Sequence, residues 1–351
     1  TASAELGQAY QGERLAFGPE YLIPKPFDPR LLPTIALAVA KAAMDSGVAT
    51  RPVDLDAYEK SLQGQVFRSF GVMRRVFDAA RAAKRRVVFA EGEDERVLRT
   101  AQAMREDIGV TPILIGRPEV VDSRIEREGL KLVRGRDFDL VNPENDPRYR
   151  DYWQSYHAVM RRRGVSPDLA KMILRSNTTA IAAVMVHRGE ADSMICGTFG
   201  EYRWHLNYVA QVLADKAHHP VAALSLIILE SGPMFIGDTQ VHLEPTGQQL
   251  AETAIAAARH VRRFGIEPKI ALCTRSQFGN LDNATGRAAR EALSILDAME
   301  LNFEYEGEMA PDAALNPTVM KNYPFSRLTA PANVLVMPGL QSANLSAKLL
   351  R

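Results

Sequence analysis

A loop that could hold an anionic group follows the apolar run KIALC. The segment 273–280, with sequence CTRSQFGN, leaves that run and precedes a stretch with helical spacing. In open parallel sheets, ligands collect at the carboxyl ends of strands, where backbone N–H groups favour phosphate. Arg275, Ser276 and Asn280 are therefore candidate ligands for an anion. The alternative is an ordinary polar loop between a strand and a helix.

A second cluster of chemically useful side chains follows the apolar run SMICG. Arg203, Trp204 and His205 supply a guanidinium, a stacking plane and a titratable ring in consecutive positions. His205 could act as a general base, but the sequence does not identify a carboxylate that would orient it. The alternative is a packed helix start.

A basic triplet at 161–163 precedes Gly164. The simplest interpretation is a helix C-terminus on a solvated face, where cations are favourable. Arginine also suits phosphate geometrically, so Arg161 and Arg162 are further candidate contacts for a phosphorylated ligand.

The remaining chemical signals are weak. His218 and His219 are adjacent, and two adjacent histidines seldom converge on one ion, so we expect a loop there and no metal site in this chain. The motifs G-x-G-x-x-G, G-x-x-x-x-G-K-[ST], H-E-x-x-H and C-x-x-C are all absent from the sequence. A complete dehydrogenase, P-loop enzyme or zinc enzyme is therefore not expected.

Alternating apolar strands and amphipathic helices must position these loops. The expected strands are 85–90, 111–116, 193–197, 221–229, 234–243, 269–273 and 333–338, and the expected helical segments are 91–104, 150–188, 201–215, 247–264 and 284–299. This order predicts an α/β fold with mostly parallel sheets and helices on both faces. The short connection at 230–233 predicts antiparallel pairing of 224–229 with 234–241.

The first 65 residues differ from the rest of the chain in their sequence pattern. Four prolines between 17 and 31 predict an extended strap, because each removes a backbone donor and fixes φ. A helix is expected over 32–49, with Ser46 and Gly47 at its C-cap. The polar stretch that follows, to about residue 65, is typical of a domain boundary.

Composition sets the broad class. With 351 residues, 46% hydrophobic and 24% charged, the chain should fold into about two lobes. A formal charge of +1 argues against nucleic acid and anionic lipid as partners. No apolar run reaches the length of a membrane span, and Cys196 and Cys273 cannot form a disulfide framework, so a reducing compartment, the cytoplasm, is expected. A start at Thr1 and an end at Arg351, within an apparent helix, predict that the chain is a piece of a longer protein.

From residue 67 onward the sequence resembles the phosphate acetyltransferase and phosphate butyryltransferase family. The blocks that carry the resemblance, in order, are VVFAEGEDERVLRTAQ, TPILIG, GEADSMICG, DTQVHLEPTGQQLAETAIAAA, RRFGIEPKIALC, YEGEMAPDAAL and ANVLVMPGLQSANLSAKLL. The first 65 residues resemble the end of a bacterial malic enzyme. The two parts occur together in hybrid NADP-dependent malic enzymes, which this chain therefore resembles as a whole.

The resemblance implies a fold and a domain plan. The architecture would be two-lobed and isocitrate dehydrogenase-like, with a ligand cleft between the lobes. Residues 1–66 would be the tail of the malic enzyme domain and a linker. Lobe 1 would span 67–217, with the chain returning to it at 338–351, and lobe 2 would span 218–337.

Departures from the family pattern bear on catalysis. Asn207 stands where the resemblance implies an arginine for acetyl phosphate, and Gly200 stands where it implies a histidine. An amide in place of a guanidinium removes charge-assisted bonds, each worth roughly 1.5–3 kcal/mol. The family's S-R-G-C-S-like segment would lie beyond Arg351. The resemblance therefore implies no catalytic residue in this chain.

The resemblance then implies a regulatory role. The retained cleft would bind acetyl-CoA as an effector that inhibits the attached malic enzyme, and NADP and magnesium or manganese would bind only in the part outside this chain. The effector contacts would come from Arg161, Arg162, Asn207, Arg275, Ser276 and Asn280. Expected partners are the acyl-CoA effector, the chain's own malic enzyme domain and further copies in a homo-oligomer. An active phosphate acetyltransferase and an oligomerisation scaffold remain the alternatives.

Overall fold

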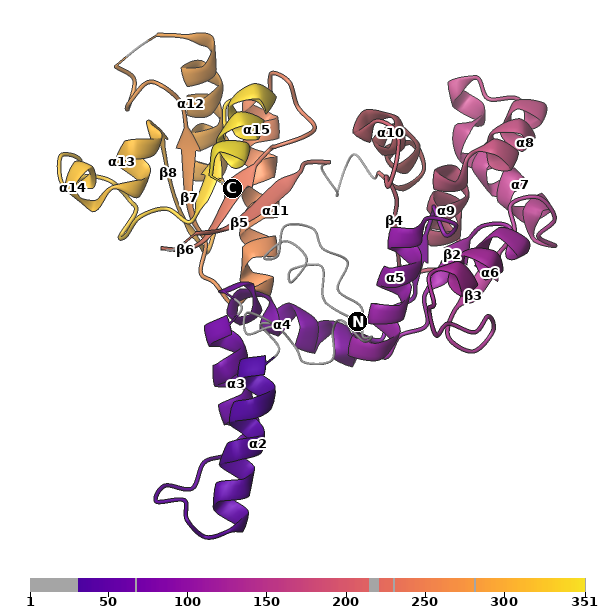
Figure 1. The fold of residues 1–351 in the computed structure, drawn as a ribbon. Coiled ribbons are helices and arrows are strands. Elements are labelled where there is room, and N and C mark those ends of the chain that lie inside the picture. Colours follow the sequence, from indigo (N-terminus) through magenta and orange to yellow (C-terminus); the bar gives the residue numbers. More distant parts are fainter. Residues whose placement is uncertain (1–30, 67, 215–220, 230, 281, 351) are drawn as a thin grey trace. The chain divides into compact units, whose positions relative to one another are not determined.

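The computed structural model describes residues 31–350 except 67, 215–220, 230 and 281 (Figure 1). The proline-rich strap at 17–31 lies outside the described residues apart from Leu31, and so do His218 and His219. The chain divides into two compact units, Thr1–Arg74 and Arg75–Arg351.

Three helices make up the described part before the first strand. They are α2 (Leu31–Asp45), α3 (Leu55–Val66) and α4 (Arg68–Ala83). The predicted C-cap of α2 is confirmed, because Gly47 has φ +75° and its N–H donates to Met44 O at 3.1 Å. The polar stretch expected as a boundary instead forms α3, which packs against α2.

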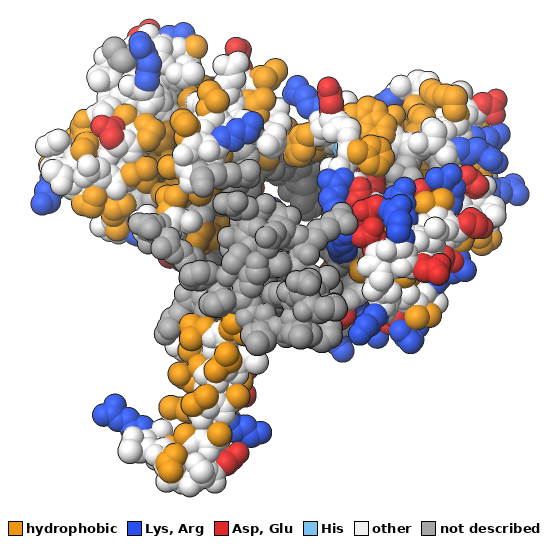
Figure 2. Space-filling view, in the orientation of Figure 1, with side chains coloured by type: hydrophobic (Ala, Val, Ile, Leu, Met, Phe, Trp, Pro, Cys, Tyr) orange, Lys and Arg blue, Asp and Glu red, His pale blue; other side chains and the backbone are white. Residues whose placement is uncertain are grey.

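Helix α2 keeps apolar side chains on its surface. Leu32, Ile35 and Val39 are exposed, and Figure 2 shows the apolar side chains that run along this hairpin.

Lobe 1 is built on a four-stranded parallel sheet in the order β3-β2-β1-β4. Its strands are β1 (Val87–Phe89), β2 (Ile113–Ile115), β3 (Asp139–Val141) and β4 (Ser193–Ile195). Its helices are α5 (Glu95–Ala103), continued by a π-helical turn at Met104–Ile108, α6 (Pro118–Arg127), α7 (Tyr149–Met160), the 3-10 turn Arg161–Arg163, α8 (Pro167–Ser176), α9 (Thr178–His187) and α10 (Tyr202–Leu213).

The positions of the buried residues account for the sequences of two lobe 1 helices, α9 and α5. Helix α9 is apolar on all sides and its residues 179–185 are buried, so it is the central core helix. Helix α5 has one apolar face, with Val97, Leu98 and Ala101 buried, and begins at Asp94, whose side chain accepts from Arg96 N–H. The predicted single segment at 150–188 is therefore several helices.

Lobe 2 is built on a five-stranded mixed sheet in the order β5-β6-β9-β7-β8. Its strands are β5 (Leu224–Leu229), β6 (Gly232–Gly237), β7 (Lys269–Cys273), β8 (Glu304–Met309) and β9 (Val334–Val336). The predicted antiparallel pairing of β5 with β6 is confirmed, and the other neighbours are parallel. Its helices are α11 (Gly247–Arg263), α12 (Ala284–Asp297), α13 (Pro311–Leu315), α14 (Pro317–Met320) and α15 (Leu340–Leu349).

Two expectations about lobe 2 are wrong. The strand expected over 234–243 ends at Gly237, because the buried Asp238 carboxylate accepts the N–H groups of the following residues and folds them into a loop. The terminal segment 338–351 does not return to lobe 1 in the described structure. Ala343 and Ala347 of α15 are buried in one cluster with Ile236 and Leu335 of lobe 2.

Among the described residues, no single helix is long and apolar enough to span a bilayer. The bent pair formed by α8 and α9 meets that length and composition together, with 109° between them.

Candidate functional site

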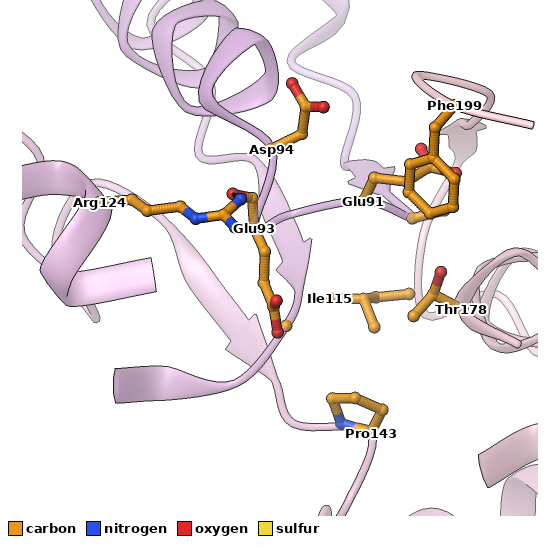
Figure 3. Close-up of a pocket in the computed structure, with 10 residues that line it drawn as sticks. Glu91, Glu93, Asp94, Ile115, Arg124, Pro143, Thr178 and Phe199 are labelled. Carbon is orange, nitrogen blue, oxygen red and sulfur yellow. Dashed lines mark hydrogen bonds between the residues drawn. The ribbon is translucent and has the colours of Figure 1, made fainter. Parts of the chain in front are cut away.

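A pocket of about 340 Å³ opens at the carboxyl edge of the lobe 1 sheet (Figure 3). The strand order reverses between β1 and β4, because β2 and β3 lie on one side of β1 and β4 lies on the other. Such a reversal leaves a crevice at the strand ends, which is where open α/β sheets bind ligands. The pocket is lined by Ala90, Glu91, Glu93, Asp94, Ile115, Gly116, Arg124, Pro143, Thr178 and Phe199.

Glu91 joins the two strands that flank the crevice. It follows β1 and is 6% exposed, and both its carboxylate oxygens lie 3.1 Å from the Gly197 nitrogen, just after β4. Gly92 allows this turn, because a Cβ there would lie 2.7 Å from the Leu114 Cβ. The carboxylate therefore has a fixed place in the wall.

His205 belongs to the same wall and is 4% exposed. Its Nε2 lies 2.7 Å from Phe199 O and its Nδ1 lies 2.8 Å from Thr179 Oγ1. A carbonyl only accepts, so Nε2 carries a proton, and the other nitrogen is engaged by the threonine. The general-base role considered for His205 is wrong, because neither ring nitrogen is open to a substrate.

Two other carboxylates of the pocket, Glu93 and Asp94, are paired with arginines that are not among its lining residues. Arg117 hydrogen-bonds to Glu93 and lowers the pKa of that carboxyl group. Arg96 hydrogen-bonds to Asp94 and lowers its pKa to about 2. Arg124 donates to the backbone carbonyl of Glu93. In Figure 3, Arg124 and Glu93 lie on one side of the pocket and Phe199 and Thr178 on the other.

The lobe 1 residues predicted to bind a ligand lie outside this pocket. Arg161 and Arg162 form an exposed 3-10 turn that ends at Gly164, as the helix-end interpretation predicts. Asn207 is exposed on α10. Gly200 has φ +83°, and a Cβ there would lie 3.3 Å from His205 Nε2, so a histidine at this position would be strained.

The lobe 2 candidates lie in one loop after β7 but play different parts. Arg275 is exposed and makes no ion pair in the described structure. Ser276 is fully buried and donates its hydroxyl to Glu308 Oε1 at 2.7 Å, so its predicted contact with an anion is wrong. Asn280 is exposed and its Oδ1 accepts from Gln277 N–H at 2.9 Å, which closes the loop.

Glu308 is the anchor of this loop. It is fully buried, and its Oε1 also accepts from Gly279 N–H at 3.2 Å and Arg290 Nη1 at 2.8 Å. The Glu308 carboxylate therefore already takes up the donors of this loop that an anionic ligand would need.

Both cysteine thiols have raised pKa values. Burial raises the pKa of Cys273 to about 12, and burial together with the Glu91 charge raises that of Cys196 to about 11. In the described part of the chain, no three His, Cys, Asp or Glu side chains converge as a metal site.

Sequence reasoning missed Glu91 and Asp238, the carboxylates that organise the two sheet edges. Each directly follows an apolar strand and is followed by a polar turn, as in the printed runs VVFAEGED and MFIGDTQ. A carboxylate at the carboxyl end of a strand was the available signal.

Known proteins resemble this chain in sequence and in fold. The family model described as "Phosphate acetyl/butaryl transferase" matches residues 71–351. The EutD phosphotransacetylase from Staphylococcus aureus superposes with a TM-score of 0.70 at 25% identity, over 79% of this chain and 84% of that one. A phosphotransacetylase from Streptococcus pyogenes gives 0.69 at 27% identity, over 78% of this chain and 85% of that one.

The similarity to malic enzymes extends over nearly the whole chain. It is 46% identical to the NADP-dependent malic enzyme of Salmonella typhimurium, over 99% of this chain and 46% of that protein. It is 47% identical to an NAD-dependent malic enzyme of Rhizobium meliloti, over 98% of this chain and 45% of that protein. The chain thus spans about half the length of these relatives. By its fold, its sheet-edge pocket and the family match over 71–351, this chain belongs to the phosphate acetyl/butaryl transferase family.

Proposed function

We propose that this chain is the acetyl-CoA-sensing regulatory part of an NADP-dependent malic enzyme and has no transferase activity of its own. The observation that carries the proposal is the composition of the lobe 1 pocket. Three of its lining side chains are carboxylates, and the arginine among them, Arg124, donates to a backbone carbonyl.

This wall disfavours acetyl phosphate and tolerates a thioester. A phosphoryl dianion must exchange its water for charge-assisted donors, and carboxylates at its side oppose its entry. The acetyl thioester end of acetyl-CoA is neutral and loses less on leaving water. Replacement of the expected arginine by Asn207 supports the same distinction.

The phosphates of the effector need cations outside the pocket. Arg161, Arg162 and Arg275 are exposed, and Asn207 and Asn280 present amides, so all five remain proposed contacts. Ser276 is withdrawn from this set, because its hydroxyl is donated to Glu308.

Catalysis of malate oxidation belongs, in this proposal, to the part of the longer protein outside this chain. NADP and the divalent metal would bind there. The acetyl-CoA signal would reach that part through the segment containing α2 and α3.

A scaffold role is a second candidate, favoured by the apolar surface of α2. Exposed Leu32, Ile35 and Val39 are the kind of surface that pairs with another protein surface, including that of a second copy. If removal of residues 1–54 left the oligomer size unchanged by light scattering, this role would be lost.

The main proposal is tested by titration calorimetry. We expect acetyl-CoA to bind the purified chain and acetyl phosphate to give no heat above dilution. An assay that couples acetyl phosphate to CoA should show no turnover above the buffer blank. Absence of acetyl-CoA binding would remove the sensor, and clear turnover would establish the transferase alternative.

A further inference from the structure

Lobe 2 contains a buried carboxylate paired with an imidazole. Asp238 directly follows β6 and is 6% exposed. Its Oδ2 lies 2.7 Å from His242 Nδ1. The two residues are four positions apart and stand in a loop that sequence reasoning assigned to a strand.

The backbone fixes the carboxylate in place. Asp238 Oδ1 accepts from the N–H groups of Ala223, Gln240 and Val241 at 2.9, 3.1 and 3.1 Å. Oδ2 accepts from the His242 N–H at 3.0 Å. With these donors on both oxygens, the carboxylate cannot turn away from the ring.

This contact determines which nitrogen of His242 carries the proton. An ionised carboxylate only accepts, so Nδ1 must donate, and in the neutral ring Nε2 holds the lone pair. No hydrogen bond engages Nε2 in the described structure, and the side chain is 21% exposed. His205 differs on both counts, because it is 4% exposed and both its nitrogens are engaged.

The loop of the pair contacts the segment that follows the lobe 1 pocket. Arg203, which follows the Phe199 loop of the lobe 1 pocket, donates to Val241 O in the loop of the pair at 3.3 Å. Only β9 separates β6 from β7, whose loop carries Arg275, so the ends of these two strands are about 10 Å apart at the sheet edge. An extended ligand can therefore touch both.

Backbone donors start beside the same loop. Leu340 N–H donates to His242 O at 3.0 Å, so the first turn of α15 begins against the loop of the pair. The first N–H groups of a helix are free of intrahelical partners and favour developing negative charge.

We propose that His242, oriented by Asp238, is a general base that hydrolyses the acyl-CoA thioester slowly, with water as the nucleophile. This rests on the proposed function, since acyl-CoA must first bind. Nε2 takes a proton as the water oxygen bonds to the thioester carbonyl carbon. The tetrahedral intermediate collapses, the C–S bond breaks, and the imidazolium returns the proton to the CoA thiolate. The products are acetate and CoA, so the bound signal ends itself.

The test measures binding and hydrolysis separately on the intact protein, with acetyl-CoA as the probe. Calorimetry gives the Kd, and release of free thiol gives kcat. His242→Asn keeps a polar side chain without a base, and should lower kcat about 100-fold or more with the Kd unchanged. Asp238→Asn should lower kcat as well, because an amide NH₂ facing Nδ1 favours the tautomer with the proton on Nε2. His157→Asn in α7 is the matched control and should change neither quantity.

The outcomes separate this inference from the proposed function. The inference is supported if the wild-type protein binds and hydrolyses acetyl-CoA and only the Asp238 and His242 variants lose the hydrolysis. Binding without hydrolysis above the uncatalysed rate, or hydrolysis that survives His242→Asn, overturns it and leaves the sensor intact. Absence of acetyl-CoA binding overturns both. Should Asp238→Asn fail to fold by circular dichroism, His242→Asn alone decides between these outcomes.

Discussion

The carboxylate of Glu91 bridges the two strands at the crevice of lobe 1, with both oxygens 3.1 Å from the Gly197 nitrogen. This single residue joins the end of β1 to the end of β4. One of its oxygens also lies 3.8 Å from His205 Nδ1.

Truncation of this residue should destabilise the fold. Glu91→Ala leaves the Gly197 N–H without its partner in a half-buried wall, which costs about 1–3 kcal/mol. Glu91→Gln keeps one acceptor oxygen and should cost less. Urea unfolding followed by circular dichroism measures both. Equal stability of wild type and Glu91→Ala would show that the bridge contributes nothing.

The ionised Asp94 carboxylate should stabilise the folded state, and this contribution should be lost in acid. The hydrogen bond from Arg96 lowers the pKa of Asp94 from its ordinary 3.8 to about 2. A lowered pKa stabilises the folded state above pH 3.8, and that contribution is lost as pH falls toward 2. Asp94→Asn keeps one oxygen for the N-cap and removes the charge together with the second acceptor for Arg96.

Urea midpoints of wild type and Asp94→Asn should therefore differ at pH 5 and converge as the pH falls toward 2. Taking the difference between the two proteins cancels the titration of other carboxylates. A difference that stays constant over this range would contradict the assignment of the effect to the Arg96 pair.

Thiol reactivity should follow burial. The pKa of Cys196 is raised from 9.0 to about 11, which leaves about 100-fold less thiolate near neutral pH. Cys273 is buried and its pKa is raised to about 12. In the native chain we expect both to resist iodoacetamide at pH 8, and Cys273 more than Cys196. In urea both should react at the rate of a free thiol, and fast native labelling of Cys273 would disagree with its burial.

Restoring one arginine should not restore catalysis. Asn207→Arg places a cation on an exposed face of α10, but the carboxylates of the pocket wall and the glycine at 200 remain. We expect no turnover of acetyl phosphate with CoA above the blank. Asn207→Lys is the control for charge alone. Measurable turnover from Asn207→Arg would show that a single guanidinium was all the site lacked.

Sequence patterns were sufficient to predict several buried strands, but they did not predict the edge strand β3 or the end of β6. The apolar runs of β1 and β7 are continuous, so they identify buried strands directly. β3 was missed because Asp139–Val141 begins with an exposed aspartate and buries only Val141, so it has no apolar run. The strand expected over 234–243 was too long. Val241 and Leu243 alternate with polar residues as in a strand, but they lie in a loop whose backbone N–H groups bind the Asp238 carboxylate.

The site was harder to predict than the fold, because its residues act over long separations. Glu91 and Gly197 are 106 positions apart, and Ser276 and Glu308 are 32 apart. Local sequence identified the loops after β4 and β7, but it could not show that Ser276 faces a carboxylate or that both nitrogens of His205 are engaged. Type and spacing thus locate a sheet edge, and only packing assigns each side chain its partner.

The central claim is that a pocket lined by three carboxylates and one arginine is a receptor for a neutral thioester. Titration calorimetry of the purified chain with acetyl-CoA and, separately, with acetyl phosphate tests it most directly. The account predicts saturable heat with acetyl-CoA and none with acetyl phosphate. Saturable binding of acetyl phosphate, or no heat with acetyl-CoA, would contradict it.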